Sequence, residues 1–226
     1  YLNGQENEND STQIITYSLP LLYGDGTPIG VLGVEISIDY LRKWLPSDEL
    51  QADNRGGYLL AGHLIRSGHK KIAGIFKSDD AQGPERYHGV VCAMRDAGLF
   101  PLDENFLWFS SFQRHQLVEL QDEELLRAFL RQQLGGCTAV VCYNDEIAFH
   151  LIRTLLRAGK RVPEDVAIVS FDNSYYSTFG PVSITSAGHE PHAMGCAAAE
   201  NLLIQIRRQP CQSVKLPWTL YQRQSG

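Results

Sequence analysis

The chain has 226 residues, of which 43% are hydrophobic and 20% charged, and it carries a net charge of −6. This length suits one large domain or two small ones. This negative net charge argues against binding of nucleic acid through the overall electrostatic field of the chain. It does not exclude a basic DNA-binding module on a longer parent chain. We find neither a run of about 18 apolar residues nor a signal peptide, so we expect no membrane span and a cytoplasmic location.

The five cysteines do not form a Cys-x-x-Cys pair, and most of them lie in apolar runs. An odd number of cysteines in such positions favours free thiols in a reducing compartment over a disulfide framework or a zinc site. We therefore expect no cofactor and no metal. The cysteines are Cys92, Cys137, Cys142, Cys196 and Cys211.

The first 49 residues differ in pattern from the rest of the chain. Residues 1–12 are polar and are predicted to be a flexible terminus. Residues 13–49 predict a β-hairpin plus a helix: two β-rich runs flank GDGTP at 24–28, and DYLRKWL at 39–45 reads as a short amphipathic helix capped by Asp39. GDGTPIG has the glycines of a phosphate-binding loop, but it leads into a strand instead of a helix, which favours the hairpin.

From about residue 50 to residue 226, helices and strands alternate, which predicts βαβ units and an α/β fold with a parallel sheet flanked by helices. The long helix expected at 117–135 is one of five, and the tail adds an edge-like strand at 184–190. The remaining expected helices are 55–68, 84–98, 145–160 and 191–209, and the remaining expected strands are 71–76, 105–110, 138–143, 166–171 and 213–224.

Three of the predicted strands end in polar residues. The strand at 71–76 leads into Lys77 and two aspartates, the strand at 138–143 leads into Asn144 and Asp145, and the strand at 166–171 leads into Asp172. In open α/β sheets, ligands bind just beyond the carboxyl ends of the strands. Acids, amides and a lysine on one rim suit a neutral polyol, whose hydroxyls both donate and accept hydrogen bonds.

Each of these residues also has a simpler interpretation. Asp172 could belong to an ordinary turn, Asp145 could complement the dipole at a helix N-terminus, and Arg86, which could point into the rim, could be a solvated helix residue. Some of the aromatic residues near the strand ends could stack on the apolar face of a sugar. These are Tyr143, Phe171, Tyr175, Tyr176 and Phe179.

Catalytic and metal motifs are weak. The sequence has no Gly-x-Ser-x-Gly, no His-Glu-x-x-His, no Walker A and no Gly-x-Gly-x-x-Gly. His189 and His192 of HEPH lack further ligands at metal spacing, so a helix entry is the better interpretation. Asp79 and Asp80 could form an acid/base pair, but adjacent residues in an extended segment point apart. We therefore do not expect an enzyme.

Five stretches together resemble the effector-binding domain of LacI/GalR-type transcription repressors, in order and in spacing, over roughly residues 50–225. GIFKSDDAQG at 74–83 and CYNDEIA at 142–148 most resemble the arabinose-responsive repressors of the AraR type. The five stretches begin DNRGG at 53, ERYHG at 85, TAVVCYNDE at 138, ITSAGHEPH at 184 and LPWTLYQ at 216.

This resemblance implies a periplasmic-binding-protein-like fold of type I, with a small sugar such as L-arabinose bound between two subdomains. It places Arg86, Asn144 and Asp172 on the sugar, with Lys77 as a weaker candidate. It also implies a homodimer and an operator DNA site on a helix-turn-helix arm, which this chain does not contain. The bound sugar would control DNA binding allosterically.

Residues 13–48 depart from that family. The run PLLYGDGTPIGVLGVEIS at 20–37 resembles the end of an extracellular Cache-type sensor domain, or these residues could belong to a partial first subdomain. A second hypothesis is therefore a Cache-type small-molecule sensor module of a membrane signalling protein. The sequence favours the first hypothesis, in which residues 50–226 form a sugar-binding α/β effector domain.

Overall fold

The computed structural model describes residues 14–22, 28–37, 47–211 and 214–226. The chain divides into two compact units, Tyr1–Glu49 and Leu50–Gly226. The first unit contains β1 (Ile14–Leu22) and β2 (Pro28–Ser37). They pair antiparallel from Ile14 opposite Ser37 to Leu22 opposite Pro28, with an irregularity between Leu21 and Leu22. These strands flank the turn expected at 24–28; most of that turn, the helix expected at 39–45 and the terminus at 1–12 lie outside the described residues.

The second unit is built on a six-stranded sheet in the order β4-β3-β5-β6-β7-β8. The first five strands in this order run parallel, and β8 runs antiparallel to β7. The α/β fold with a parallel sheet is therefore confirmed. The strands are β3 (Ile72–Lys77), β4 (Phe106–Phe109), β5 (Ala139–Cys142), β6 (Ala167–Phe171), β7 (Thr185–Gly188) and β8 (Thr219–Tyr221).

The prediction of an edge strand at 184–190 is wrong. β7 lies inside the sheet because the last strand of the chain, β8, pairs with its free side, Ala187 opposite Leu220. The sequence around β8 contains Pro217 and only a short apolar run, so its pairing partner could not be inferred from local pattern.

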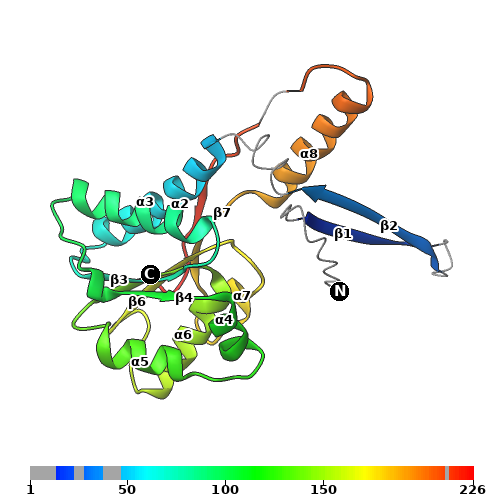
Figure 1. Cartoon of the computed structure of the whole chain (residues 1–226). Coiled ribbons are helices and arrows are strands. Elements are labelled where there is room, and N and C mark those ends of the chain that lie inside the picture. The colour runs from blue at the N-terminus through cyan, green and yellow to red at the C-terminus, as the bar shows by residue number, and fades with distance from the viewer. Residues whose placement is uncertain (1–13, 23–27, 38–46, 212–213) are drawn as a thin grey trace, which may run out of the picture. The chain divides into compact units, whose positions relative to one another are not determined.

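Helices cover both faces of the sheet (Figure 1). α2 (Ser47–Arg66) and α3 (Gln82–Asp96) lie on one face, and α5 (Glu124–Gln132) and α6 (Asp145–Arg157) lie on the other. Two buried clusters follow from this arrangement. In β5, Val140 packs into the cluster with α5 and α6, whereas Val141 packs into the cluster with α2 and α3. The strands are apolar throughout because both of their faces are covered.

The single helix expected at 117–135 is two helices, α4 (Ser111–Val118) and α5. α4 begins early because Ser110 and Gln113 form a reciprocal capping box. The chain then turns at Gln121, whose φ is 55°, and the Asp122 carboxylate accepts the Glu124 N–H at 3.0 Å. Leucines on both sides of this break continue the helical pattern, which explains why the sequence predicted one helix.

α2 and α3 cross at two glycines. A Cβ on Gly57 would lie 2.2 Å from the carbonyl oxygen of Arg86, and a Cβ on Gly89 would lie 1.9 Å from the carbonyl oxygen of Asn54. Only glycine allows the two backbones to approach this closely. The crossing brings the middle of α2 against the helix that carries Arg86.

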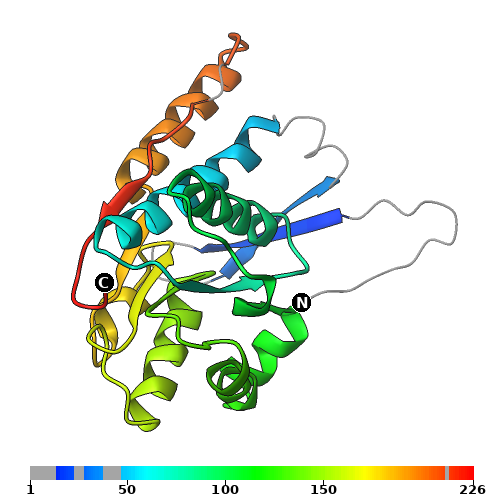
Figure 2. The same cartoon turned by 90° about the vertical axis from the view of Figure 1, so that its left-hand side faces the viewer.

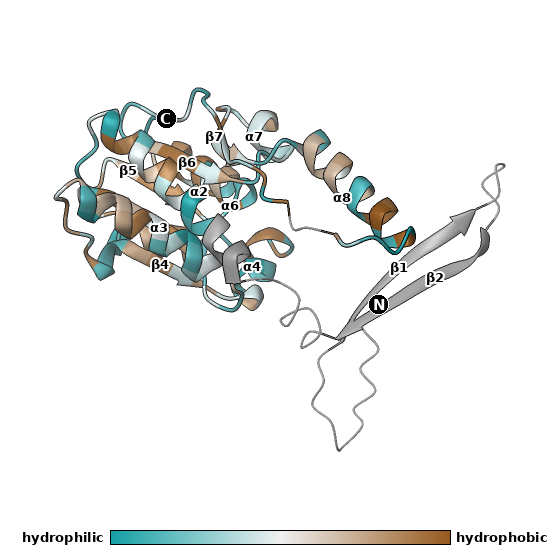
Figure 3. Cartoon of the chain, turned by 90° about the horizontal axis from the view of Figure 1, so that it is seen from above, coloured by the Kyte–Doolittle hydropathy of each residue, from teal (hydrophilic) through white to brown (hydrophobic). Residues whose placement is uncertain are grey.

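The remaining elements are a 3-10 turn at Asp103–Asn105, α7 (Tyr176–Phe179) and α8 (Pro191–Ile206). α8 extends beyond the sheet (Figure 2), and much of it is hydrophobic (Figure 3). Four of its large apolar side chains are exposed: Met194, Leu202, Leu203 and Ile206. The cysteines form no disulfide in the part of the chain that the structure describes; Cys137 and Cys142 are buried, whereas Cys196 is exposed.

We expect Leu151→Ala to lower the free energy of unfolding by about 2–5 kcal/mol, because Leu151 on α6 is fully buried in the core. Leu156→Ala on the same helix is the matched control, since Leu156 is partly exposed, and should cost clearly less. Urea unfolding of both variants measures the difference, and equal losses would contradict the described packing of α6.

Candidate functional site

The polar residues after β3, β5 and β6 lie at one edge of the sheet. These strands are neighbours and parallel: Ile75 on β3 is opposite Cys142 on β5, and Val141 on β5 is opposite Val169 on β6. Their carboxyl ends therefore point the same way. The structure brings Lys77, Asn144 and Asp172 to this edge, as the sequence predicted.

Arg86 lies at the centre of this edge and is 3% exposed. Its Nε donates to Asp53 Oδ1 at 2.9 Å, its Nη2 donates to Asp172 Oδ1 at 3.0 Å, and its Nη1 donates to the carbonyl oxygen of Tyr143 at 2.5 Å. The interpretation of Arg86 as a solvated helix residue is therefore wrong. A buried guanidinium requires such partners, because an unpaired buried charge is costly.

Two aromatic rings hold the Arg86 guanidinium. Its Cζ lies 4.4 Å from the centroid of the Phe171 ring and 4.9 Å from that of Tyr143. Cation–π contacts of this kind favour a planar guanidinium over an ammonium. Burial alone would lower the pKa of Arg86, but the carboxylates of Asp172 and Asp53 outweigh it and raise that pKa. Arg86 therefore remains charged.

Asp172 occupies an unusual backbone conformation, with φ at 94°, and Asn173 follows with φ at 46°. The Asp172 N–H donates to the carbonyl oxygen of Ala187 at 2.8 Å, and Asn173 Oδ1 accepts from Arg223 Nη2 at 2.6 Å. Strained backbone conformations of this kind concentrate at ligand sites. Burial raises the pKa of Asp172, while Arg86 opposes that rise. The Asp172 side chain is nevertheless 41% exposed, so its carboxylate is reachable from outside.

Lys77 is tied to the two aspartates that follow it. Its Nζ lies 3.3 Å from Asp80 Oδ2 and 3.6 Å from Asp79 Oδ1. The Tyr143 hydroxyl donates to Asp80 Oδ2 at 2.5 Å, and Asp79 Oδ2 accepts the N–H of Ser111 at 2.8 Å. Beside Lys77, which they share, Asp80 accepts from a hydroxyl and Asp79 from a backbone N–H, which speaks against a paired acid/base role. Burial, followed by the bond to Asp80, raises the pKa of Tyr143.

Asn144 and Asp145 begin α6 in different ways. Asn144 is the N-cap, and its Oδ1 accepts the N–H of Ile147 at 3.0 Å. Asp145 is fully buried; its Oδ1 accepts from the Ser170 hydroxyl and its Oδ2 accepts the N–H of Ser174 at 2.6 Å. Burial raises the pKa of Asp145 even though these bonds favour its charged form. The Asp145 side chain therefore stabilises the loop after Asp172 from inside the protein. It does not face the solvent at the edge of the sheet.

One participant, Asp53 on α2, was not predicted as a site residue; it binds Arg86 across 33 positions of sequence. Tyr143, one of the aromatic residues expected to be able to stack on a sugar, contributes its carbonyl and its ring to Arg86. No local pattern marks Asp53, because its role depends on the crossing of α2 and α3. Tyr175 and Phe179 stack on one another instead, with ring centroids 4.9 Å apart.

His189 Nδ1 lies 3.1 Å from the carbonyl oxygen of Pro217, and its ring packs on Trp218 at 4.2 Å between centroids. Among the described residues, no group of three or more His, Cys, Asp or Glu side chains is placed to hold a metal ion. Within the same residues, none of the helices has the length and apolar character needed to span a membrane.

Comparisons with known proteins agree with the fold. A family model described as a periplasmic binding protein-like domain matches residues 61–226. The chain is 35% identical over 182 residues to the arabinose metabolism transcriptional repressor of Geobacillus stearothermophilus; the alignment covers 80% of this chain and 49% of the repressor. The chain thus spans about half the length of that relative.

Two solved structures extend the comparison. The transcriptional regulator CelR in complex with cellobiose superposes with a TM-score of 0.66 and 27% identity, over 77% of this chain and 52% of CelR. A LacI family transcriptional regulator from Enterococcus faecium with bound ribose gives a TM-score of 0.64 and 26% identity, over 77% and 63%. The relatives reported are regulators of transcription, not enzymes. The chain therefore belongs to the periplasmic binding protein-like family, in the form of the effector-binding domain of LacI/GalR-type transcription regulators.

Proposed function

We propose that residues 50–226 form the sugar-sensing domain of a cytoplasmic transcription repressor, with L-arabinose or a similar small sugar as effector. The observation that carries this proposal is the arrangement of Arg86 and Asp172. Arg86 is fixed by Asp53, by the Tyr143 carbonyl and by two rings, and it holds Asp172 in place through a hydrogen bond. The side chain of Asp172 is nevertheless 41% exposed. A carboxylate in this position can accept the hydroxyls of a sugar.

The other residues of the site have graded roles in this proposal. Asn144 and Lys77 contribute polar groups on the neighbouring strand ends. Asp145 acts by positioning, because both of its oxygens are used by Ser170 and Ser174. Among ligands, arabinose is supported by a relative that is 35% identical, and the structures with cellobiose and ribose support sugars more generally.

The effector would act by a shift of population. A sugar that binds one arrangement of two subdomains better than another favours that arrangement, which sets the spacing of the DNA-binding arms on an operator. We expect a coupling of about 1–3 kcal/mol per site. The operator-binding arm would belong to the part of the protein outside the chain described here, since this chain spans about half the length of its relative.

A second candidate concerns only the N-terminal unit. The family match begins at residue 61, so the antiparallel pair β1–β2 lies outside it. We therefore keep the proposal that residues 13–49 derive from a Cache-type sensor module or from a partial first subdomain. The gene sequence upstream of this chain would distinguish the two origins. A transmembrane helix there favours the Cache-type sensor, and a helix-turn-helix favours a partial first subdomain of the repressor.

A homodimer is part of the first proposal, and the aromatic surface around α7 is its best candidate interface. Tyr175 and Phe179 are 68% and 62% exposed although they stack on each other, and Phe149 of α6 lies beside Tyr176 and Phe179. Large exposed apolar patches on soluble proteins mark interaction sites.

The test of the function is isothermal titration of the full-length protein with L-arabinose, ribose and cellobiose. We expect Asp172→Ala to weaken binding of the best sugar by more than about tenfold, because an acceptor in a partly buried site is lost. Asp165→Ala is the control, since Asp165 is an acid paired with Arg161 away from this rim. Failure of the full-length protein to bind any sugar would refute the proposed function.

Arg86→Lys tests whether sugar binding requires the planar guanidinium, which donates to Asp53 and Asp172 through different nitrogens. Lysine keeps the charge but cannot donate to Asp53 and Asp172 in the same geometry, so we expect about a tenfold loss of sugar affinity in a protein that stays folded. Arg95→Lys, in the last turn of the same helix, should bind as the parent does. Thermal melts establish that both variants fold. Unchanged affinity in Arg86→Lys would remove Arg86 from the site.

Phe179→Ser tests the homodimer. We expect the dimer dissociation constant to rise at least about tenfold, because aromatic residues at the centre of an interface carry much of its energy. Phe100→Ser is the matched control, as Phe100 is an exposed phenylalanine in the loop after α3. Sedimentation velocity of the full-length variants measures the constants. The same dissociation constant in Phe179→Ser and in the parent would place the interface elsewhere.

A further inference from the structure

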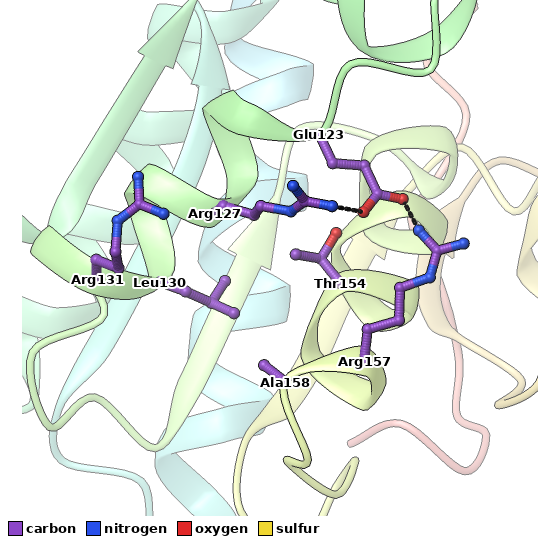
Figure 4. Close-up of a pocket in the computed structure, with 7 residues that line it drawn as sticks. All are labelled: Glu123, Arg127, Leu130, Arg131, Thr154, Arg157 and Ala158. Carbon is purple, nitrogen blue, oxygen red and sulfur yellow. Dashed lines mark hydrogen bonds and ion pairs between the residues drawn. The ribbon is translucent and has the colours of Figure 1, made fainter.

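A second candidate site lies on the face of the sheet opposite α3, the helix that carries Arg86. A cavity of about 310 Å³ opens between α5 and α6 (Figure 4). This volume is at the lower end of the range for small-molecule pockets. The cavity is lined by Glu123, Arg127, Leu130, Arg131, Thr154, Arg157 and Ala158.

The lining is cationic in an otherwise acidic chain. It contains three arginines and one glutamate, whereas the whole chain carries a net charge of −6. Glu123 is nearly buried, with its side chain 7% exposed, and it is paired with both Arg157 and Arg127, the latter at 3.5 Å. Its negative charge is therefore already offset by two guanidinium groups, and Arg131 is paired with Glu124, which does not line the cavity.

The arginine head groups retain donors for a ligand. Each guanidinium has five N–H donors. Arg157 donates one hydrogen bond to Glu123, and Arg131 donates one to Glu124 at 2.5 Å. The three side chains remain 55–57% exposed. Each of them can therefore donate further N–H groups to an anion while it keeps its present carboxylate partner.

The floor of the cavity is of a different character. Leu130, Ala158 and the methyl group of Thr154 lie between the arginines, and the Thr154 hydroxyl donates to the carbonyl oxygen of His150 at 2.9 Å. Because that hydroxyl already has an acceptor, the floor offers mainly apolar contact. A cationic rim over an apolar floor suits an organic anion better than a bare inorganic ion.

We propose that this cavity binds a small phosphomonoester, with its phosphate on the arginines and its carbon skeleton on the floor. The planar fork of arginine matches phosphate oxygens through paired hydrogen bonds, which are stronger than neutral ones. The cavity and the Arg86 edge use different residues. The phosphomonoester is therefore a second ligand, and its binding does not depend on the proposed sugar site.

The experiment is titration of the full-length protein with glycerol 3-phosphate, inorganic phosphate and glycerol at constant ionic strength, followed by NMR or calorimetry. We expect roughly millimolar or tighter binding of glycerol 3-phosphate, weaker binding of inorganic phosphate and none of glycerol. Arg131→Gln should weaken glycerol 3-phosphate binding by roughly three- to tenfold, because a half-exposed charge-assisted contact is lost.

Arg161→Gln is the matched control, because it removes the same charge from an exposed arginine that is paired with Asp165 and does not line the cavity. It should leave binding unchanged. Equal losses in the two variants would reduce the effect to general electrostatics and overturn the proposal. No binding of glycerol 3-phosphate at tens of millimolar would overturn it as well, and equal affinity for inorganic phosphate would overturn the role of the floor.

Arg157→Gln probes the rim from α6, but it also removes a partner of the nearly buried Glu123. A thermal melt decides whether this variant folds. If it folds, it should lose binding as Arg131→Gln does, and retained binding would contradict the proposal. If it unfolds, the comparison of Arg131→Gln with Arg161→Gln decides alone.

Discussion

The buried charge of Arg86 is the constraint on which this edge of the molecule depends. A guanidinium that is 3% exposed must find a partner for its charge and acceptors for its N–H groups. It finds them on α2, on the end of β5 and on the end of β6, so one side chain joins three elements that are distant in sequence. The geometry of the candidate sugar site follows from this single residue.

The buried carboxylate of Asp145 fixes the loop after β6. Asp145 holds Ser170 of β6 and the N–H of Ser174, so the loop that contains Asp172 is fixed from inside the protein. Burial raises the pKa of both Asp145 and Asp172, and each resists that rise through its own hydrogen bonds. The buried Asp145 thus fixes the loop that carries the exposed Asp172. The surrounding structure also keeps the left-handed backbone at Asp172 in place.

The strands and the polar rim could be predicted because their signals are local. An apolar run followed by Asn144 or Asp172 shows both a buried strand and its carboxyl end, and neighbouring parallel strands place such ends together. Asp53 could not be predicted, since its meaning comes from a partner 33 positions away. The break at Gln121 was missed for a different reason: leucines on both sides keep the helical period while a single left-handed residue ends the helix.

The crossing of α2 and α3 at Gly57 and Gly89 has a mechanical consequence. At this crossing the two helices meet backbone to backbone, without side chains that could change rotamer and absorb a displacement. Asp53 and Arg86 lie next to this crossing, so the backbone contact holds them in a fixed position relative to one another. A shift imposed on Asp172 at the end of β6 would be transmitted through the guanidinium to the whole axis of α2, and so to the point where the chain enters this domain.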